Sequence, residues 1–302
     1  MKPLPFTYNF DNSTSVQQQT IEFLEGNEDI AGQLFELSWA FHSIGIAIPH
    51  TTENWWSGHY FPFSESFEEF EISFLLCSQG FYKQSMTSLR SVLETGLLSV
   101  YYNINDEGHK TVQGWLQSED GKQNDTPYFN TIWKILIAHP NILKFQTVYD
   151  IKADILNLEY LHNYVHSKGA KYSNQIGLSK SNTQTFEKTG FNKWLETAHK
   201  VVRVILTLHL LKFPLGIIEY DFSRKFGIDI PTFGGLNSFH IARIKSVLGE
   251  TLSENLLNIA LEDESVIDFI KQIESMPDIT QTEIDKQIET MNRMTDGKQH
   301  YS

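Results

Sequence analysis

Two histidines in the segment LEYLHNYVHSKG have the chemistry needed for acid–base catalysis. His162 and His166 lie four positions apart, and Asn163 follows the first of them directly. Histidine titrates near neutral pH, so one imidazole can accept a proton while another donates one. In a helix, residues four positions apart lie on the same face. The segment is therefore a candidate active site.

A structural role would explain the same residues. His162 follows Leu158 by one turn in an apolar stripe with Ile155 and Val165, which predicts a core histidine whose ring nitrogens are both hydrogen-bonded. Asn163 and His166 would then lie at the edge of the core, where a site could open. Both interpretations stay open at this point, and a metal site is a third.

Arg90 and Glu94 form a second polar feature beside an apolar stripe. Their spacing of four residues allows the two side chains to contact each other on one helix. A partly buried arginine needs a partner, because an unpaired buried charge is costly. The pair either fixes the packing of its helix, or Arg90 reaches towards His162 and His166 and completes a polar site.

The segment from 167 to 189 is locally basic in an acidic protein. Lys168, Lys171 and Lys180 belong to it, and Glu187 is its one acidic residue. We predict a loop here, which is either an ordinary solvated loop or a surface for RNA.

Metal ligands are a weaker possibility. Glu159 and His162, like Glu196 and His199, have the three-residue spacing found in di-iron bundles, and Glu94 could add a carboxylate. With 11 histidines and 37 acidic residues, such spacings also arise by chance. We predict no metal and no cofactor. The single cysteine, Cys77, lies in an apolar stretch and is expected to be inert.

Apolar residues recur at helical spacing through most of the chain, whereas strand alternation is absent over any useful length. Thr126 and the pairs Ser66–Glu69 and Thr280–Glu283 are predicted helix caps. The expected inner faces are Tyr82, Met86, Leu89, Leu93, Leu97 and Val100; Val148, Ile151, Ile155, Leu158 and Val165; Phe191, Trp194, Ala198, Val201, Ile205 and Leu208; and Ile284, Ile288 and Met291.

The resulting prediction is an all-α protein. A bundle of four to five long helices (61–220) follows an N-terminal helical arm (1–60) and precedes a small C-terminal helical unit (221–302). A net charge of −13 argues against broad, non-specific nucleic-acid binding, although a local basic groove remains compatible with it. The one cysteine and the absence of an apolar leader or membrane segment favour a cytoplasmic protein without membrane contact.

The segments SLRSVLETGLLSVYY and YLHNYVHSKG together resemble the all-α HEPN superfamily of bacterial defence and toxin proteins. The resemblance covers roughly residues 65–212. It implies a helical bundle that cleaves RNA without metal, often as a homodimer, with Arg90, Glu94, Asn163 and His166 at the site. The active pattern is an arginine, then four to six residues, then a histidine. Here His162 stands in place of that arginine, only three residues before His166.

An Arg-x5-His pattern does occur at Arg203 and His209, but the residues between them are all apolar and predict a coincidence. The first functional prediction is therefore a HEPN-like ribonuclease or RNA-binding protein. The alternative is a non-enzymatic interaction module, in which apolar helices and the aromatic segment 55–63 bind a second copy or a partner protein. A carboxylate–histidine metal protein is the third.

Overall fold

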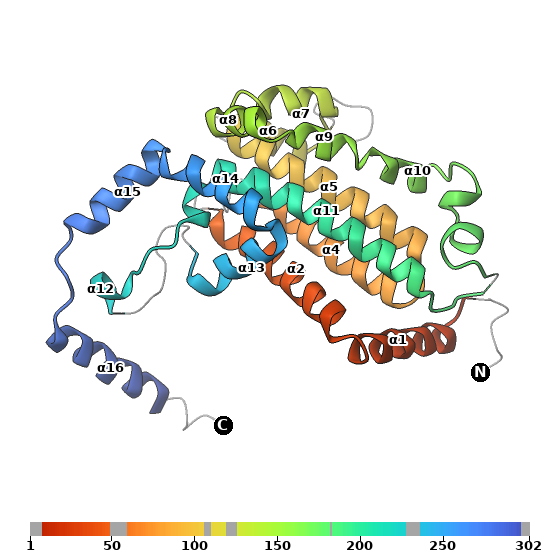
Figure 1. Cartoon of the computed structure of the whole chain (residues 1–302), viewed down its shortest axis with the longest axis horizontal. Helices are drawn as coiled ribbons and strands as arrows, with labels where there is room; N and C mark the ends of the chain where they lie inside the picture. The colour runs from red at the N-terminus through yellow and green to blue at the C-terminus, as the bar shows by residue number, and fades with distance from the viewer. Residues whose placement is uncertain are drawn as a thin grey trace.

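The computed structural model describes residues 8–48, 59–105, 110–118, 126–181, 183–227 and 236–296. Every regular element in these ranges is a helix, which confirms the all-α prediction (Figure 1). The first four residues of the predicted aromatic segment at 55–63 lie outside the described residues.

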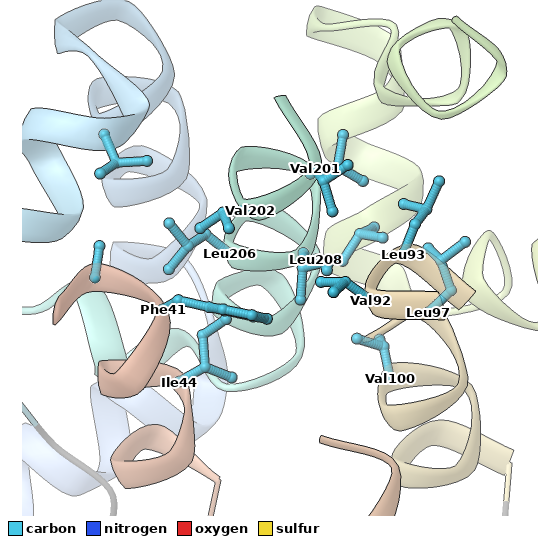
Figure 2. Packing of buried hydrophobic residues seen from close by; sticks show 14 of the residues in the cluster. Phe41, Ile44, Val92, Leu93, Leu97, Val100, Val201, Val202, Leu206 and Leu208 are labelled. Carbon is cyan, nitrogen blue, oxygen red and sulfur yellow. The ribbon is translucent and has the colours of Figure 1, made fainter. Parts of the chain in front are cut away.

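Four long helices share one core: α2 (Glu28–Ala47), α4 (Phe61–Ser78), α5 (Tyr82–Asn105) and α11 (Lys188–Lys212). The predicted stripes on α5 and α11 are buried along their whole length. Figure 2 shows Phe41 and Ile44 of α2 on one side of α11, and Val92 and Leu97 of α5 on the other. Because α11 has neighbours on most sides, even its polar Thr207 and His209 are buried.

A glycine permits the close contact between α5 and α11. A Cβ at Gly96 would lie 2.5 Å from Cδ1 of Ile205, so any larger residue would force the Ile205 side chain to shift. This contact fixes α5 against α11 and thereby positions the helix that carries Arg90 and Glu94.

The connection between α4 and α5 also depends on a glycine. Gly80 has φ +80°, which glycine adopts without strain. The predicted cap at Ser66 and Glu69 is wrong, because α4 already begins at Phe61 with Pro62 in its first turn. Ser66 lies inside the helix, and its hydroxyl donates to the carbonyl of Val92 at 2.7 Å.

Short helices cover one side of α5 (Figure 1). The predicted cap at Thr126 is wrong, because the helix begins at Phe129 and Thr126 instead accepts a hydrogen bond from Trp115 Nε1 at 3.2 Å. The elements in this part are α6 (Lys110–Leu116), α7 (Phe129–Leu136), α8 (Pro140–Val148), α9 (Ile151–Leu156), the 3₁₀ helix η2 (Glu159–Leu161), α10 (His162–Val165), η3 (Ala170–Tyr172) and the π-helical turn η4 (Asn174–Leu178).

The core extends beyond both predicted domain boundaries, because α2 packs on α13 and the core cluster runs from Leu37 to Val266. The domain boundaries at 60 and 220 stay predictions. The remaining elements are α1 (Phe10–Glu25), η5 (Pro214–Ile217), α12 (Ser223–Phe226), α13 (Ser238–Leu248), α14 (Glu250–Leu261), α15 (Glu264–Ser275) and α16 (Gln281–Asp296).

The last helix, α16, stands apart from the bundle (Figure 1). Its capping box is confirmed: Thr280 N–H donates to Glu283 Oε2 at 2.9 Å, and Glu283 N–H donates to Thr280 Oγ1 at 3.3 Å. The predicted inner face is wrong, since Ile288 and Met291 are about half exposed. An amphipathic pattern shows which face of a helix is apolar, but the fold decides whether anything covers that face.

Candidate functional site

The main candidate site is a pocket of about 780 Å³ between α5, α7 and the segment from 155 to 168. We call it the α5–α10 pocket. Its walls combine apolar side chains with two cations, two carboxylates, a histidine and an asparagine. It is lined by Arg90, Leu93, Glu94, Leu97, Leu98, Thr126, Pro127, Tyr128, Phe129, Ile132, Ile155, Leu158, Glu159, Tyr160, His162, Asn163 and Lys168.

Arg90 and Glu94 enter the pocket from α5. They form an ion pair across one helical turn, with 24% and 49% of their side chains exposed. This pairing agrees with the structural role considered for them. Both residues also line the same pocket as His162, which agrees with the alternative in which Arg90 faces the histidines. The two roles are compatible, because an arginine has five N–H donors and one carboxylate does not occupy them all.

His162 and His166 form a contacting pair of exposed rings. Their centroids lie 4.2 Å apart, and the ring planes are inclined by 63°. The pKa of His162 is lowered, first by desolvation, then by the nearby His166, Arg90 and Lys168, while Glu94 opposes the shift. The lowered pKa favours the neutral ring, which can accept a proton.

The prediction that His162 is a core histidine is wrong, because the helix expected to carry it is broken. The chain leaves α9 after Leu156 and passes through a 3₁₀ turn before α10. The buried residues here are Leu158, Leu161 and Tyr164. Their spacing of three residues matches the pitch of a 3₁₀ helix, so the inner face shifts away from His162. The predicted inner-face residue Val165 is accordingly 45% exposed.

A tight turn brings Lys168 to the same pocket. The N–H of Lys168 donates to the carbonyl of Asn163 at 3.0 Å, and Ser167 adopts a positive φ of 49°. Asn163 and Lys168 both line the α5–α10 pocket, and His166 reaches it through its contact with His162.

The other two predicted RNA-binding lysines lie elsewhere. Lys171 sits over the ring of Tyr172 at 5.4 Å from its centroid, and Lys180 is exposed with φ +51°. Neither lines the α5–α10 pocket. Much of the predicted loop is in fact ordered against the bundle, because Asn174 Oδ1 accepts the N–H of Lys83 at 3.2 Å.

Sequence reasoning missed the aromatic residues that line the pocket. Tyr128, with 88% of its surface exposed, and Phe129 lie at the start of α7 and line the pocket. Tyr160 joins them, and its hydroxyl is hydrogen-bonded to Thr197 Oγ1 at 2.8 Å. No signal in the sequence marks these two residues, because their place in the pocket depends on how α7 packs against α5.

The second Glu-x-x-His pair lines a different and smaller pocket of about 410 Å³, which we call the α11 pocket. It is lined by Ile30, Gln33, Asn192, Leu195, Glu196, His199, Lys200 and Arg203. Glu159 and His162 thus lie in a different pocket from Glu196 and His199. Within the described ranges, no group of three or more histidine, cysteine or acidic side chains is arranged to hold a metal ion.

Arg203 and His209 do not form a joint site, as the apolar residues between them predicted. Arg203 pairs with Asp154 at 3.4 Å, whereas His209 is fully buried. Nδ1–H of His209 donates to the carbonyl of Ile205 at 2.9 Å, so Nε2 accepts from the Ser99 hydroxyl, also at 2.9 Å. Burial lowers the pKa of His209 to about 4 and keeps the ring neutral.

Cys77 is also buried, and burial raises the pKa of its thiol well above the ordinary range. A protonated, inaccessible thiol is a poor nucleophile, as the sequence led us to expect. Among the described helices, none is long and apolar enough to cross a membrane.

Comparison with known proteins adds no relative. No family model, no curated protein and no solved structure matches this chain. The α5–α10 pocket must therefore be interpreted from its own chemistry.

Proposed function

We propose that the α5–α10 pocket binds RNA and cleaves it without a metal ion. The main support is that one pocket contains both Arg90, from α5, and His162, Asn163 and Lys168, from the segment that follows α9. Cations at a pocket rim attract a phosphodiester, and a neutral histidine beside them can activate a hydroxyl.

The proposed reaction uses the 2′-hydroxyl of the RNA as the nucleophile. His162 accepts the proton of this hydroxyl, and the 2′-oxygen attacks the adjacent phosphorus. The bond from phosphorus to the 5′-oxygen of the next nucleotide breaks, and that oxygen takes a proton from water. The products are a 2′,3′-cyclic phosphate and a 5′-hydroxyl, and His162 then releases its proton to solvent. Arg90 stabilises the negative charge that grows on the phosphate oxygens.

The contact between the two histidine rings limits their roles. Attacking and leaving oxygens lie roughly in line on opposite sides of the phosphorus. Two rings with centroids 4.2 Å apart on one side cannot straddle it. We therefore assign the base to His162 alone. His166 is a positioning residue that orients the His162 ring. It does not act as the proton donor, although a second histidine could have had that role.

The family assignment belongs to the same proposal. A HEPN-like bundle at 61–220, a role in bacterial defence and a homodimer all depend on the resemblance of the Arg90 and His166 segments. Arg90, Glu94 and Asn163 line one pocket, so the two segments that carry the resemblance come together in the fold, which supports it.

The test is cleavage of varied RNAs by purified protein with and without EDTA. We expect strand cleavage that EDTA does not inhibit, and 2′,3′-cyclic phosphate ends that are detected by mass spectrometry. Substitution of 2′-methoxy groups for the hydroxyls should abolish the reaction, because the nucleophile is then blocked. Absence of cleavage across structured and unstructured RNAs would contradict the proposal.

A non-enzymatic interaction module is the second candidate, and one surface favours it. Phe35, Trp39 and Phe239 are 37–49% exposed, and their rings contact one another in a row. The guanidinium carbon of Arg243 lies 3.5 Å from the centroid of Phe239 and 5.3 Å from that of Phe35. Exposed aromatic and arginine side chains are typical of protein interfaces. Light scattering of the wild type and Trp39→Ala tests this candidate: a dimer that the substitution dissociates would favour it.

A further inference from the structure

We infer that the apolar wall of the α5–α10 pocket is a subsite for one nucleobase, with Tyr128 and Phe129 as its stacking residues. The inference rests on the proposed function and adds the part of the ligand that the apolar wall recognises. Catalysis at a phosphate needs only the polar rim, so the apolar part of the pocket requires its own explanation.

The shape and composition of the pocket support a base. Its volume of about 780 Å³ falls within the roughly 300–1,000 Å³ of small-molecule sites, where apolar walls carry a few polar groups. Leu93, Leu97 and Leu158 contribute to the wall and are otherwise almost completely buried. An apolar wall of this kind excludes a bare phosphate, which stays hydrated, and accepts the face of a ring.

Two aromatic residues border the pocket and could stack on a ring bound in it. Tyr128 and Phe129 come from the start of α7 and border the same pocket as His162 and Lys168. Tyr128 is 88% exposed, so a ligand ring can reach it without displacing a packed neighbour. Base stacking on an aromatic side chain is worth about 1–3 kcal/mol and depends little on the identity of the base.

The charges of the pocket fit a nucleotide better than a simple anion. Two carboxylates, Glu94 and Glu159, line the pocket with the two cations Arg90 and Lys168. Glu94 is paired with Arg90, whereas Glu159 has no ion-pair partner among the described residues. A carboxylate repels phosphate but accepts hydrogen bonds from ribose hydroxyls and base amino groups. A nucleotide offers both kinds of group.

A matched pair of ligands isolates the base. Adenosine 5′-monophosphate and uridine 5′-monophosphate carry the same ribose and phosphate as ribose 5-phosphate, and the protein cannot cleave any of them by the proposed reaction. In calorimetric titrations of the full chain we expect both nucleotides to bind at least about ten-fold more tightly than ribose 5-phosphate. Equal affinities, or no detectable binding of any of the three, would overturn the base subsite.

The substitution Tyr128→Ala should weaken binding of both nucleotides and leave ribose 5-phosphate unchanged. Phe10→Ala is the matched control, because Phe10 is also 88% exposed but lies on α1 and does not line the pocket. Nucleotide affinities that survive Tyr128→Ala would overturn the role of Tyr128. RNA cleavage is measured separately, so cleavage by a protein that binds both nucleotides no more tightly than ribose 5-phosphate rejects only the subsite. Nucleotide binding without cleavage rejects only the nuclease.

Discussion

The α5–α10 pocket and the α11 pocket contain nearly the same residue types in different surroundings. Each pocket has a Glu-x-x-His pair, an arginine and a lysine, but the ion-pair partners of these cations differ between the two pockets. In the α11 pocket both cations are already engaged, because Lys200 pairs with Glu196 at 2.5 Å and Arg203 pairs with Asp154. In the α5–α10 pocket Lys168 has no ion-pair partner among the described residues.

The histidines differ in the same way. His199 is half-buried, and its pKa is lowered first by desolvation and then by Arg203. His162 is exposed and contacts a second ring, His166. A histidine acts on a ligand only if the ligand can reach it, so residue spacing alone does not distinguish a site from a similar pattern. The pairing of neighbouring charges and the volume of the pocket make that distinction.

The largest expected difference between the two pockets concerns the histidines. His162→Ala removes the proposed general base and should lower kcat/KM for RNA cleavage by about 10²–10⁴-fold. His199→Ala removes the corresponding histidine of the α11 pocket and should leave kcat/KM within about two-fold of the wild type. Initial rates on one RNA substrate measure both. Equal losses in the two variants would break the distinction between the pockets.

The arginines should separate catalysis from stability. Arg90→Gln should lower kcat by about 10²–10³-fold, because it removes a donor to the charge that develops on the phosphate. Arg203→Gln should leave kcat unchanged but reduce the free energy of unfolding by about 1 kcal/mol, since it breaks a partly buried ion pair with Asp154. Kinetics and urea denaturation of both variants test the assignment. A loss of kcat in Arg203→Gln would contradict it.

The parts of the fold that could be predicted are those governed by local periodicity. The stripes of α5 and α11 repeat at helical spacing over many turns, and their burial follows from a single rule. The segment around His162 fails that rule, because two short helices joined by a 3₁₀ turn change the direction of the inner face. Nothing in the apolar pattern from Ile155 to Val165 indicates this break.

Only the polar residues of the candidate site could be predicted from the sequence. Arg90 and His162 stand out because charges and imidazoles beside apolar stripes need an explanation. The aromatic part of the pocket lining depends on how the start of α7 lies against α5, which is a long-range contact. Tyr128 and Phe129 therefore became site residues only when the packing was known.

His209 gives a reference for a histidine that lies in neither pocket. Its pKa in the folded protein is about 4, below the ordinary 6.5, so the unfolded chain binds the proton first. The contribution of the neutral His209 ring to the free energy of unfolding should therefore be complete above pH 6.5. This contribution should be lost as the pH falls from 6.5 through about 4. The loss amounts to roughly 3 kcal/mol for this group.

Urea denaturation of the wild type and His209→Gln at pH 7 and pH 4.5 tests this. The variant cannot protonate at this position, so its stability should change less between the two pH values than that of the wild type. The matched control is His166→Gln, because His166 is exposed. The same pH slope in wild type and His209→Gln would show that the buried ring does not govern the acid sensitivity.

The smallest expected effect concerns the lysines, and it tests whether the α5–α10 pocket contacts the backbone of RNA. Lys168→Ala should weaken binding of single-stranded RNA by a few-fold and reduce the slope of log affinity against log salt by about 0.7, the value for one lost phosphate contact. Lys200→Ala should change neither, because Lys200 lies in the α11 pocket and is paired with Glu196. Titrations at several salt concentrations provide the slopes. If Lys200→Ala and Lys168→Ala reduced the salt slope equally, RNA would contact the surface without preference for either pocket. The fact that Lys200 is ion-paired and Lys168 is not would then have no functional meaning.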